Sequence, residues 1–252
     1  MGKPRKKRLA NLQQGFTLVE LLVAMAMAGI VIGAIYSTYK SQQDSYVAQT
    51  HVAEMQQNLR AALYVIGRDI RMAGFNPADI NNLAGFEQSL LDGDGNEATD
   101  PTRMAFTIDD DADGAISSTL SANNNAEQIA YRKFVDVPND IYRLEKFTYD
   151  AVLGWDWRTV AENIDAIDFV YLDDNGTSID PTTATNLPLI RSVQITLLAR
   201  STHIANDYTN NQTYVNQRDV SEVGFYWSFT APGDNYRRRL LTTEIRCRNM
   251  GI

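Results

Sequence analysis

The chain has 252 residues, of which 44% are hydrophobic and 21% charged, with 15 glycines and 7 prolines. This composition is typical of one globular domain with appendages, and it excludes a disordered or fibrous chain. The net charge of −8 is unevenly distributed, because the first 15 residues hold five basic residues and no acid. The remainder has 18 basic and 31 acidic residues, a net charge of −13, which disfavours nucleic acid as a partner.

An apolar run with a single charge, Glu20, extends over residues 16–36. As a helix it would span roughly 30 Å, about one bilayer core. Basic residues flank only its N-terminal side, which predicts a single-pass helix with a cytoplasmic N-terminus. The run is longer than the apolar core of a secretory signal. A plain signal anchor fits its length but leaves Glu20 unexplained, since an acid within the membrane usually has a partner.

The segment GFTLVELLVAMA, which opens this run, closely resembles the N-terminus of type IV pilins and pseudopilins. The resemblance implies a leader peptide, residues 1–15, which the membrane-embedded prepilin peptidase removes between Gly15 and Phe16. It also implies N-methylation of Phe16, with residues 16–36 as the transmembrane half of the helix.

Glu20 would become the fifth residue of the processed chain. Its carboxylate can then pair with the cationic α-amine of Phe16 in a neighbouring subunit, which would fix the register of otherwise non-directional apolar packing. A glutamate that merely snorkels toward the membrane interface is the alternative.

The helix is predicted to continue beyond the membrane as an amphipathic half over residues 37–75. Gly74 suits a left-handed C-terminal cap and Pro77 follows it, so we expect the helix to run from residue 16 to residue 73. One apolar stripe recurs at three- and four-residue steps, and it comprises Val52, Met55, Leu59, Ala62, Leu63, Ile66, Ile70 and Ala73. Asp69 is expected on the opposite, polar side.

Residues 76–252 are predicted to form a β-rich globular domain in the periplasm or outside the cell. Strands are expected at residues 103–108, 127–135, 141–149, 163–172, 189–200, 223–230 and 236–249, with a loop over residues 201–220. The fold class is α+β: one long N-terminal helix packed on a mainly antiparallel sheet.

The acidic segment DDDADGAIS, residues 109–117, has the pattern D-x-D-x-D-G that opens an EF-hand-type calcium loop. Its expected oxygen ligands are the side chains of Asp109, Asp111 and Asp113 and the carbonyl of Ala115, with Gly114 at the turn. Leu120 stands where a bidentate glutamate is expected, so Glu127 or another loop would have to complete the shell. A solvated acidic turn is the alternative.

No motif in the sequence favours an enzyme. The two histidines, His51 and His203, lack a zinc-binding pattern, and no phosphate-binding glycine loop or nucleophile elbow is present. Five arginines between residues 237 and 248 are the one basic concentration outside the leader, and we expect local ion pairs there rather than a DNA-binding strip. The aromatic run at residues 225–229 is expected to be core on one face.

Segments beyond the N-terminal motif narrow the resemblance to a subgroup of this superfamily. Residues 58–75, 164–173, 191–200 and 237–249 resemble PilW-type minor pilins, and the J-type minor pseudopilins of type II secretion share much of this outline. Major pilins typically end in a disulfide-closed loop, which the single cysteine, Cys247, excludes. The resemblance therefore implies a minor subunit rather than the bulk filament subunit.

The implied function is that of a minor pilin in a type IV pilus, acting in the priming of assembly or at the tip. Its implied partners are prepilin peptidase, other minor and major pilins, the inner membrane and the pilus assembly machinery. It would reside in the bacterial inner membrane first and then in the pilus, the periplasm or at the cell surface. A J-type minor pseudopilin, or a tip adhesin or DNA-binding module, are the alternatives.

Overall fold

The computed structural model describes residues 15–77, 84–87, 101–116, 127–150, 154–205 and 208–251. The chain forms two compact units, Met1–Gln49 and Thr50–Ile252. The helix α1 (Leu18–Met72) begins in the first unit and ends in the second, which confirms the prediction of one long helix. Of the predicted leader, Gly15 alone lies within the described residues.

The end of α1 depends on a glycine. Gly74 has a φ of 76°, the left-handed conformation predicted for the C-terminal cap. A Cβ atom at this position would lie 2.5 Å from Sδ of Met250, so the tight contact with the C-terminal segment also requires glycine.

Within the described residues all strand pairs are antiparallel, and they form two four-stranded sheets and a two-stranded one. The first sheet has the order β1-β2-β3-β4, with β1 (Arg103–Thr107), β2 (Gln128–Asp136), β3 (Ile141–Asp150) and β4 (Gly154–Glu162). The second has the order β10-β7-β5-β6, with β5 (Ile164–Leu172), β6 (Ser178–Ile179), β7 (Ser192–Arg200) and β10 (Arg238–Arg246). A 3-10 helix, η1 (Ala184–Leu189), precedes β7, and β8 (Thr213–Val215) pairs with β9 (Ser228–Thr230).

The strands differ from the expectation in four places. The strands β4 and β6 were not predicted, and β8 lies inside the segment expected to be a loop. The strand expected over residues 223–230 is reduced to β9, because residues 222–226 form a turn in which Phe225 and Tyr226 donate backbone hydrogen bonds to the Glu222 carbonyl.

The chain passes from the first sheet to the second at a single residue, Asn163, between β4 and β5. Asn163 has a φ of 57°, a left-handed conformation that asparagine tolerates better than most residues. Its carbonyl accepts a hydrogen bond of 2.9 Å from the backbone N–H of Arg200 in β7. This sharp reversal explains why one predicted sheet is two.

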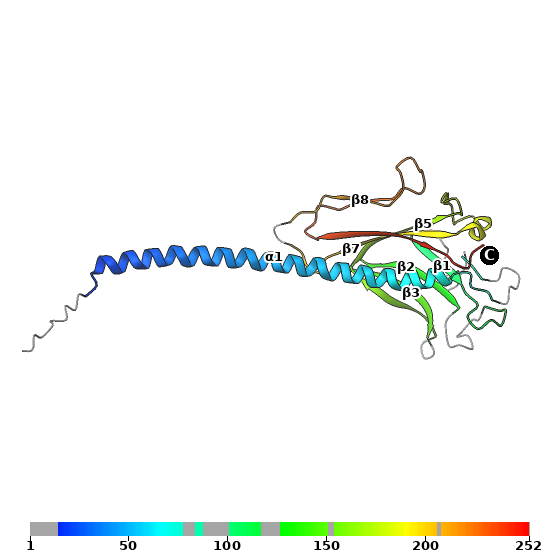
Figure 1. Cartoon of the computed structure of the whole chain (residues 1–252), viewed down its shortest axis with the longest axis horizontal. Coiled ribbons are helices and arrows are strands. Elements are labelled where there is room, and N and C mark those ends of the chain that lie inside the picture. The colour runs from blue at the N-terminus through cyan, green and yellow to red at the C-terminus, as the bar shows by residue number, and fades with distance from the viewer. Residues whose placement is uncertain are drawn as a thin grey trace, which may run out of the picture. The chain divides into compact units, whose positions relative to one another are not determined.

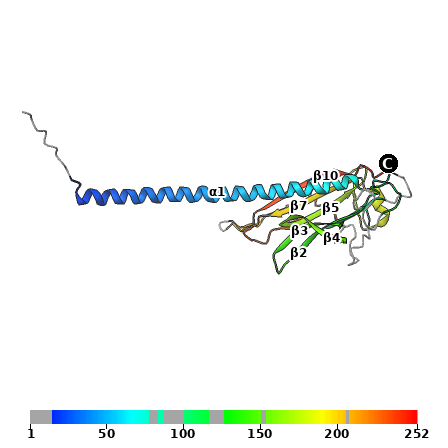
Figure 2. The same cartoon turned by 90° about the horizontal axis from the view of Figure 1, so that it is seen from below.

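The two sheets and the second half of α1 share one apolar core. The members of the predicted stripe that are buried are Met55, Leu59, Ala62, Ile66 and Ile70 of α1 and Ala73 directly after it. They pack with buried residues from both sheets, among them Phe106, Tyr131, Leu144, Phe169 and Ile195. Figure 1 shows this part of α1, in cyan, running beside both sheets, and Figure 2 shows the same arrangement from below.

A buried carboxylate links α1 to the first sheet. Asp69 is 4% exposed, although it was expected on the polar side of the helix. Its Oδ2 accepts hydrogen bonds of 2.6 Å from the Tyr131 hydroxyl in β2 and from Nζ of Lys146 in β3. Arg68 pairs with Oδ1 at 3.0 Å. Burial, followed by the negative charge of Asp69, raises the pKa of Tyr131 well above its ordinary value, so the hydroxyl stays a donor.

Replacing Asp69 by alanine is expected to lower the free energy of unfolding by about 3–5 kcal/mol, because Lys146 and Tyr131 lose a shared buried partner. Tyr131→Phe removes one hydrogen bond and should lower it by about 1–2 kcal/mol. Asp44→Ala, at an exposed position of the same helix, is the control and should change it by less than about 0.5 kcal/mol. Denaturant unfolding of the full chain in detergent micelles measures all three, and equal effects of Asp69→Ala and Asp44→Ala would contradict the role of the network.

Candidate functional site

The peptide bond between Gly15 and Phe16 lies just outside the helix. Residues 15–17 are not helical, α1 begins at Leu18, and the Phe16 side chain is 91% exposed. A peptidase can therefore reach this bond without unwinding α1. The structure is compatible with cleavage at the predicted position, which itself stays a prediction.

Glu20 takes part in a hydrogen-bonded cap at the start of α1. Oε2 of Glu20 accepts hydrogen bonds of 2.8 Å from both the backbone N–H and the hydroxyl of Thr17. The backbone N–H of Glu20 donates in return to Oγ1 of Thr17 at 3.3 Å. This reciprocal pattern is a capping box, and the sequence T-L-V-E carries its signature. This cap was not predicted, since Glu20 was expected either to pair with a neighbouring subunit or to snorkel toward the membrane interface.

The capping box does not exclude that intermolecular role. Both bonds from Thr17 end on Oε2, so among the described residues Oε1 receives no hydrogen bond and can accept one from a further cation. Thr17 and Glu20 both follow the predicted cleavage position, so the cap would persist in the processed chain. Processing would place a new α-amine on the residue next to Thr17.

The first half of α1 is exposed to its surroundings within the described part of the chain. Every residue from 15 to 47 is exposed, including large apolar side chains such as Leu18 (74%), Ile30 (74%) and Tyr36 (67%). Within the described residues, α1 is a helix long and apolar enough to cross a membrane. An apolar surface of this extent needs a bilayer or neighbouring helices to cover it.

The acidic loop after β1 brings together two of the four predicted calcium ligands. Carboxylate oxygens of Asp109 and Asp111 lie with one of Glu127 within 4.8 Å of one another. The Asp113 side chain is exposed, and its Oδ1 accepts a hydrogen bond of 2.8 Å from the backbone N–H of Ala115. Glu127 was anticipated as the residue that could complete the shell.

Two of the five arginines near the C-terminus, Arg238 and Arg246, form the local ion pairs that were expected. Arg238 is paired with Asp165 at 2.5 Å and with Asp234 at 2.6 Å. Arg246 pairs with Asp174 at 3.5 Å, whereas Arg237 stacks over the ring of Tyr208. Arg238, the most buried of them, is directed into the protein rather than toward a polyanion.

The β8–β9 pair and the loop between its strands cover the outer face of the second sheet. Trp227 and Phe229 stack at 6.4 Å and pack against a small buried cluster around Leu198 and Tyr214, so part of the aromatic run is core on one face, as expected. Asp168 of β5 is 3% exposed, and its Oδ2 accepts a hydrogen bond of 2.9 Å from the Asn216 amide. Burial raises the pKa of Asp168 to about 6.

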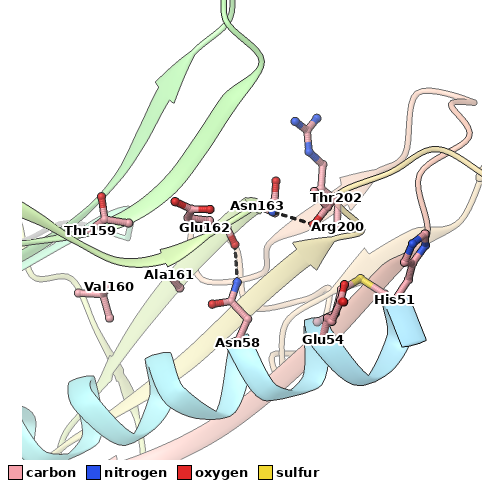
Figure 3. A pocket seen from close by; sticks show the side chains of 11 residues that line it. His51, Glu54, Asn58, Thr159, Val160, Ala161, Glu162, Asn163, Arg200 and Thr202 are labelled. Carbon is pink, nitrogen blue, oxygen red and sulfur yellow. Dashed lines mark hydrogen bonds between the residues drawn. The ribbon is translucent and has the colours of Figure 1, made fainter. Parts of the chain in front are cut away.

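A cavity of about 380 Å³ lies between residues 51–58 of α1 and the connection from β4 to β5 (Figure 3). The Asn58 amide donates to the Glu162 carbonyl at 2.5 Å, and the Asn163 amide donates to the Thr202 hydroxyl at 3.4 Å. These bonds join the walls of the cavity. The ring of His51 lies 5.6 Å from that of His203, a pairing that the sequence gave no reason to expect.

Two family models match the chain. Residues 10–36 match the prokaryotic N-terminal methylation motif, and residues 48–217, more than half of the chain, match prepilin peptidase-dependent protein B. The chain belongs to the prepilin peptidase-dependent protein B family. It is thus a type IV pilin-like protein, a minor pilin or pseudopilin that prepilin peptidase processes, and the proteins of this class are structural.

No curated protein matches the chain. Among solved structures, a type IV-like pilin from Thermus thermophilus has 13% sequence identity and a TM-score of 0.47, covering 78% of this chain and 98% of that one. The PilW-type subgroup within the superfamily stays a prediction.

The buried Asp168 predicts an unusual dependence of stability on pH. Its carboxyl is protonated below about pH 6 in the folded protein but stays ionised down to about pH 4 in the unfolded chain. The folded state therefore binds the extra proton in this window, and the stability so gained is lost as the pH rises through 6. At pH 8, Asp168→Asn should raise the free energy of unfolding by about 1–3 kcal/mol, and at pH 4 the difference should vanish.

Asp173 provides a control of opposite sign. Hydrogen bonds from Thr177 and Asn175 lower the pKa of Asp173, so Asp173→Asn should reduce stability at pH 8. Denaturant unfolding of the full chain in micelles at both pH values measures these effects. A gain from Asp168→Asn that is the same at pH 4 and pH 8 would show that Asp168 does not titrate between them.

Proposed function

We propose that this protein is a minor pilin of PilW type that enters a type IV pilus and acts in the priming of assembly or at the tip. The observation that carries the proposal is the exposed first half of α1, whose apolar run over residues 16–36 follows the predicted cleavage position directly and carries a single acid, Glu20. A helix of this kind has two suitable environments, a bilayer and a bundle of like helices. A filament subunit occupies both in turn.

The charge distribution supports one orientation before assembly. Five basic residues precede the apolar run and one, Lys40, lies in the ten residues after it, so the positive-inside rule favours a cytoplasmic N-terminus and a sheet-bearing unit outside the inner membrane. The assembly machinery would then extract α1 from the bilayer into the filament. Major and minor pilins would replace lipid around residues 16–36.

Glu20 would act as the register-fixing group in that helix bundle. Apolar helices packed side by side slide with little energetic preference, whereas an ion pair at low dielectric favours one position strongly. The pair would join Glu20 to the Phe16 α-amine of a neighbouring subunit, using the oxygen that the capping box leaves available. Gly29 and Gly33, four residues apart and with open space around both, would let a neighbouring helix approach closely.

Three observations support a minor subunit over the other candidates. Cys247 is buried and is the single cysteine, so the disulfide-closed loop typical of major pilins is excluded. The charge of −13 after processing, and the pairing of Arg238 within the fold, disfavour a DNA-binding module.

A J-type pseudopilin is the rival candidate, and deletion of the gene distinguishes it from a minor pilin. Loss of pili supports our proposal, and loss of protein secretion with normal pili supports the rival.

Processing provides a direct test. Mass spectrometry of the filament-associated protein should show an N-terminus at methylated Phe16, and Gly15→Val should block the cut because the peptidase loses the small residue at its cleavage position. Gly33→Ala, which adds one methyl group in open space well away from that position, should be cleaved normally. Filament-associated protein that still starts at Met1 would overturn the assignment.

Two substitutions at Glu20 separate its two roles. Glu20→Gln keeps an oxygen that can accept from Thr17, so the capping box survives while the charge is lost; Glu20→Val removes both. Both variants should be inserted into the membrane and cleaved, and both should enter filaments much less than the wild type. Quantitative immunoblotting of sheared filaments measures incorporation. Normal incorporation of Glu20→Gln would assign Glu20 to the capping box alone.

A further inference from the structure

We propose that Asp109, Asp111 and Glu127 form a calcium site at the edge of the first sheet. Asp109 and Asp111 belong to the loop that follows β1, and Glu127 directly precedes β2. The three side chains each offer a carboxylate oxygen, and these oxygens lie within 4.8 Å of one another. Two oxygens that bind one calcium ion at 2.3–2.6 Å can be at most about 5 Å apart, so this spacing fits a shared ion.

An oxygen without a partner points independently to a ligand. Asp109 is 0% exposed, and its Oδ1 is buried with no hydrogen-bond partner among the described residues. A buried carboxylate oxygen without a donor is costly, and such an atom in a folded protein calls for an ion or another ligand. Glu127 is also 0% exposed. Two carboxylates buried together repel one another strongly unless a cation lies between them.

The hydrogen bonds of the loop orient these carboxylates. Oδ2 of Asp109 accepts from the backbone N–H of Gly114 at 3.2 Å, and Oε1 of Glu127 accepts from that of Asp110 at 3.0 Å. Oδ1 of Asp111 accepts from the N–H of Asp113 at 3.2 Å. Each of the three carboxylates thus has an oxygen that the backbone of the loop holds in place.

Calcium fits this set better than other metals. All the ligands are carboxylate oxygens, which suit hard cations and not zinc or copper. Magnesium demands a near-ideal octahedron and retains its waters, whereas calcium accepts six to eight oxygens in an irregular loop. Asp109 and Asp111 occupy the first and third positions of the D-x-D-x-D-G pattern, and Glu127 supplies the acid that the twelfth position lacks.

The site lies where the end of α1 meets the first sheet. The backbone N–H of Asp109 donates to the Phe75 carbonyl at 2.7 Å, and the N–H of Gly74 donates to the Thr107 carbonyl at 3.2 Å. The N–H of Ile108 donates to the Glu127 carbonyl at 2.9 Å. An ion held by Asp109 and Glu127 would therefore fasten β1 and β2 together directly beside the end of the helix. This inference does not depend on the proposed role in a pilus.

Thermal unfolding of the full chain in detergent micelles, followed by near-ultraviolet circular dichroism, tests the site. With 10 mM calcium the Tm should rise by roughly 3–10 °C over its value in EGTA, as a ligand with a millimolar or tighter Kd would give. The same concentration of magnesium should give a much smaller rise. No rise with calcium, or an equal rise with magnesium, would overturn the proposal.

Amide variants locate the site. Asp109→Asn, Asp111→Asn and Glu127→Gln keep an oxygen for each loop hydrogen bond and remove one charge. Each should abolish the calcium-induced rise, and in EGTA each should have an unchanged or higher Tm because repulsion between the acids is relieved. If one of these side chains had a structural role alone, its substitution would lower the Tm equally with and without calcium. That result would contradict a metal site.

Two controls complete the experiment. Asp44→Asn makes the same charge change at an exposed position of α1 and should keep the full calcium response. Asp113→Asn changes the loop residue whose oxygen is outside the converging group, so it should keep most of the response. If Asp44→Asn also abolished the response, calcium would be acting through general charge screening, and the site would be rejected.

Discussion

The apolar surface of α1 is the constraint on which the other features depend. One helix of 55 residues carries apolar side chains along its whole length, yet its own chain buries them only from Met55 onward. The sheets cover the second half, whereas residues 15–47 are all exposed within the described part of the chain. The burial of apolar area provides most of the stabilisation available to a protein, so the uncovered half must be stabilised by lipid or by other subunits. Processing, membrane residence and assembly all concern that half.

The features that sequence predicts well here are those set by local periodicity. The stripe from Met55 to Ala73 and the glycine at residue 74 determine where α1 packs and where it ends, and both were visible in the sequence. The division of the strands into two sheets was not visible in the sequence, because it depends on the left-handed conformation of one residue, Asn163. The aromatic run before β9 has the composition of a strand, but its backbone turns at Glu222 and its rings serve as a cover for the second sheet.

The residues of the candidate sites also fall into two groups, those that a local sequence motif reveals and those that only the fold reveals. Gly15, Phe16, Glu20 and the Asp109 loop were found because each lies in a short motif. The capping partner of Glu20 was also readable three residues upstream. The burial of Asp69 was not readable, since its partners Tyr131 and Lys146 are 62 and 77 residues away. Long-range pairs of this kind reverse the usual rule that an acid in an amphipathic helix faces solvent, because a buried charge is tolerated when a cation and donors accompany it.

Acidic residues lie at the start of α1, in its second half and beyond its end, and the negative charge of each is compensated in a different way. Asp69 has its cation within the fold, so the attachment of the helix to the first sheet is permanent. Asp109 and Glu127 are the acids for which we infer an ion from solution, so the junction at the helix end would be strengthened only where calcium is available. Glu20 is held by Thr17 alone until, on the proposed mechanism, cleavage creates an amine at Phe16. The charge pair that fixes subunit register would then be impossible in the precursor. Cleavage would thus do more than remove a basic leader, since it would also create the cation on which ordered helix packing depends.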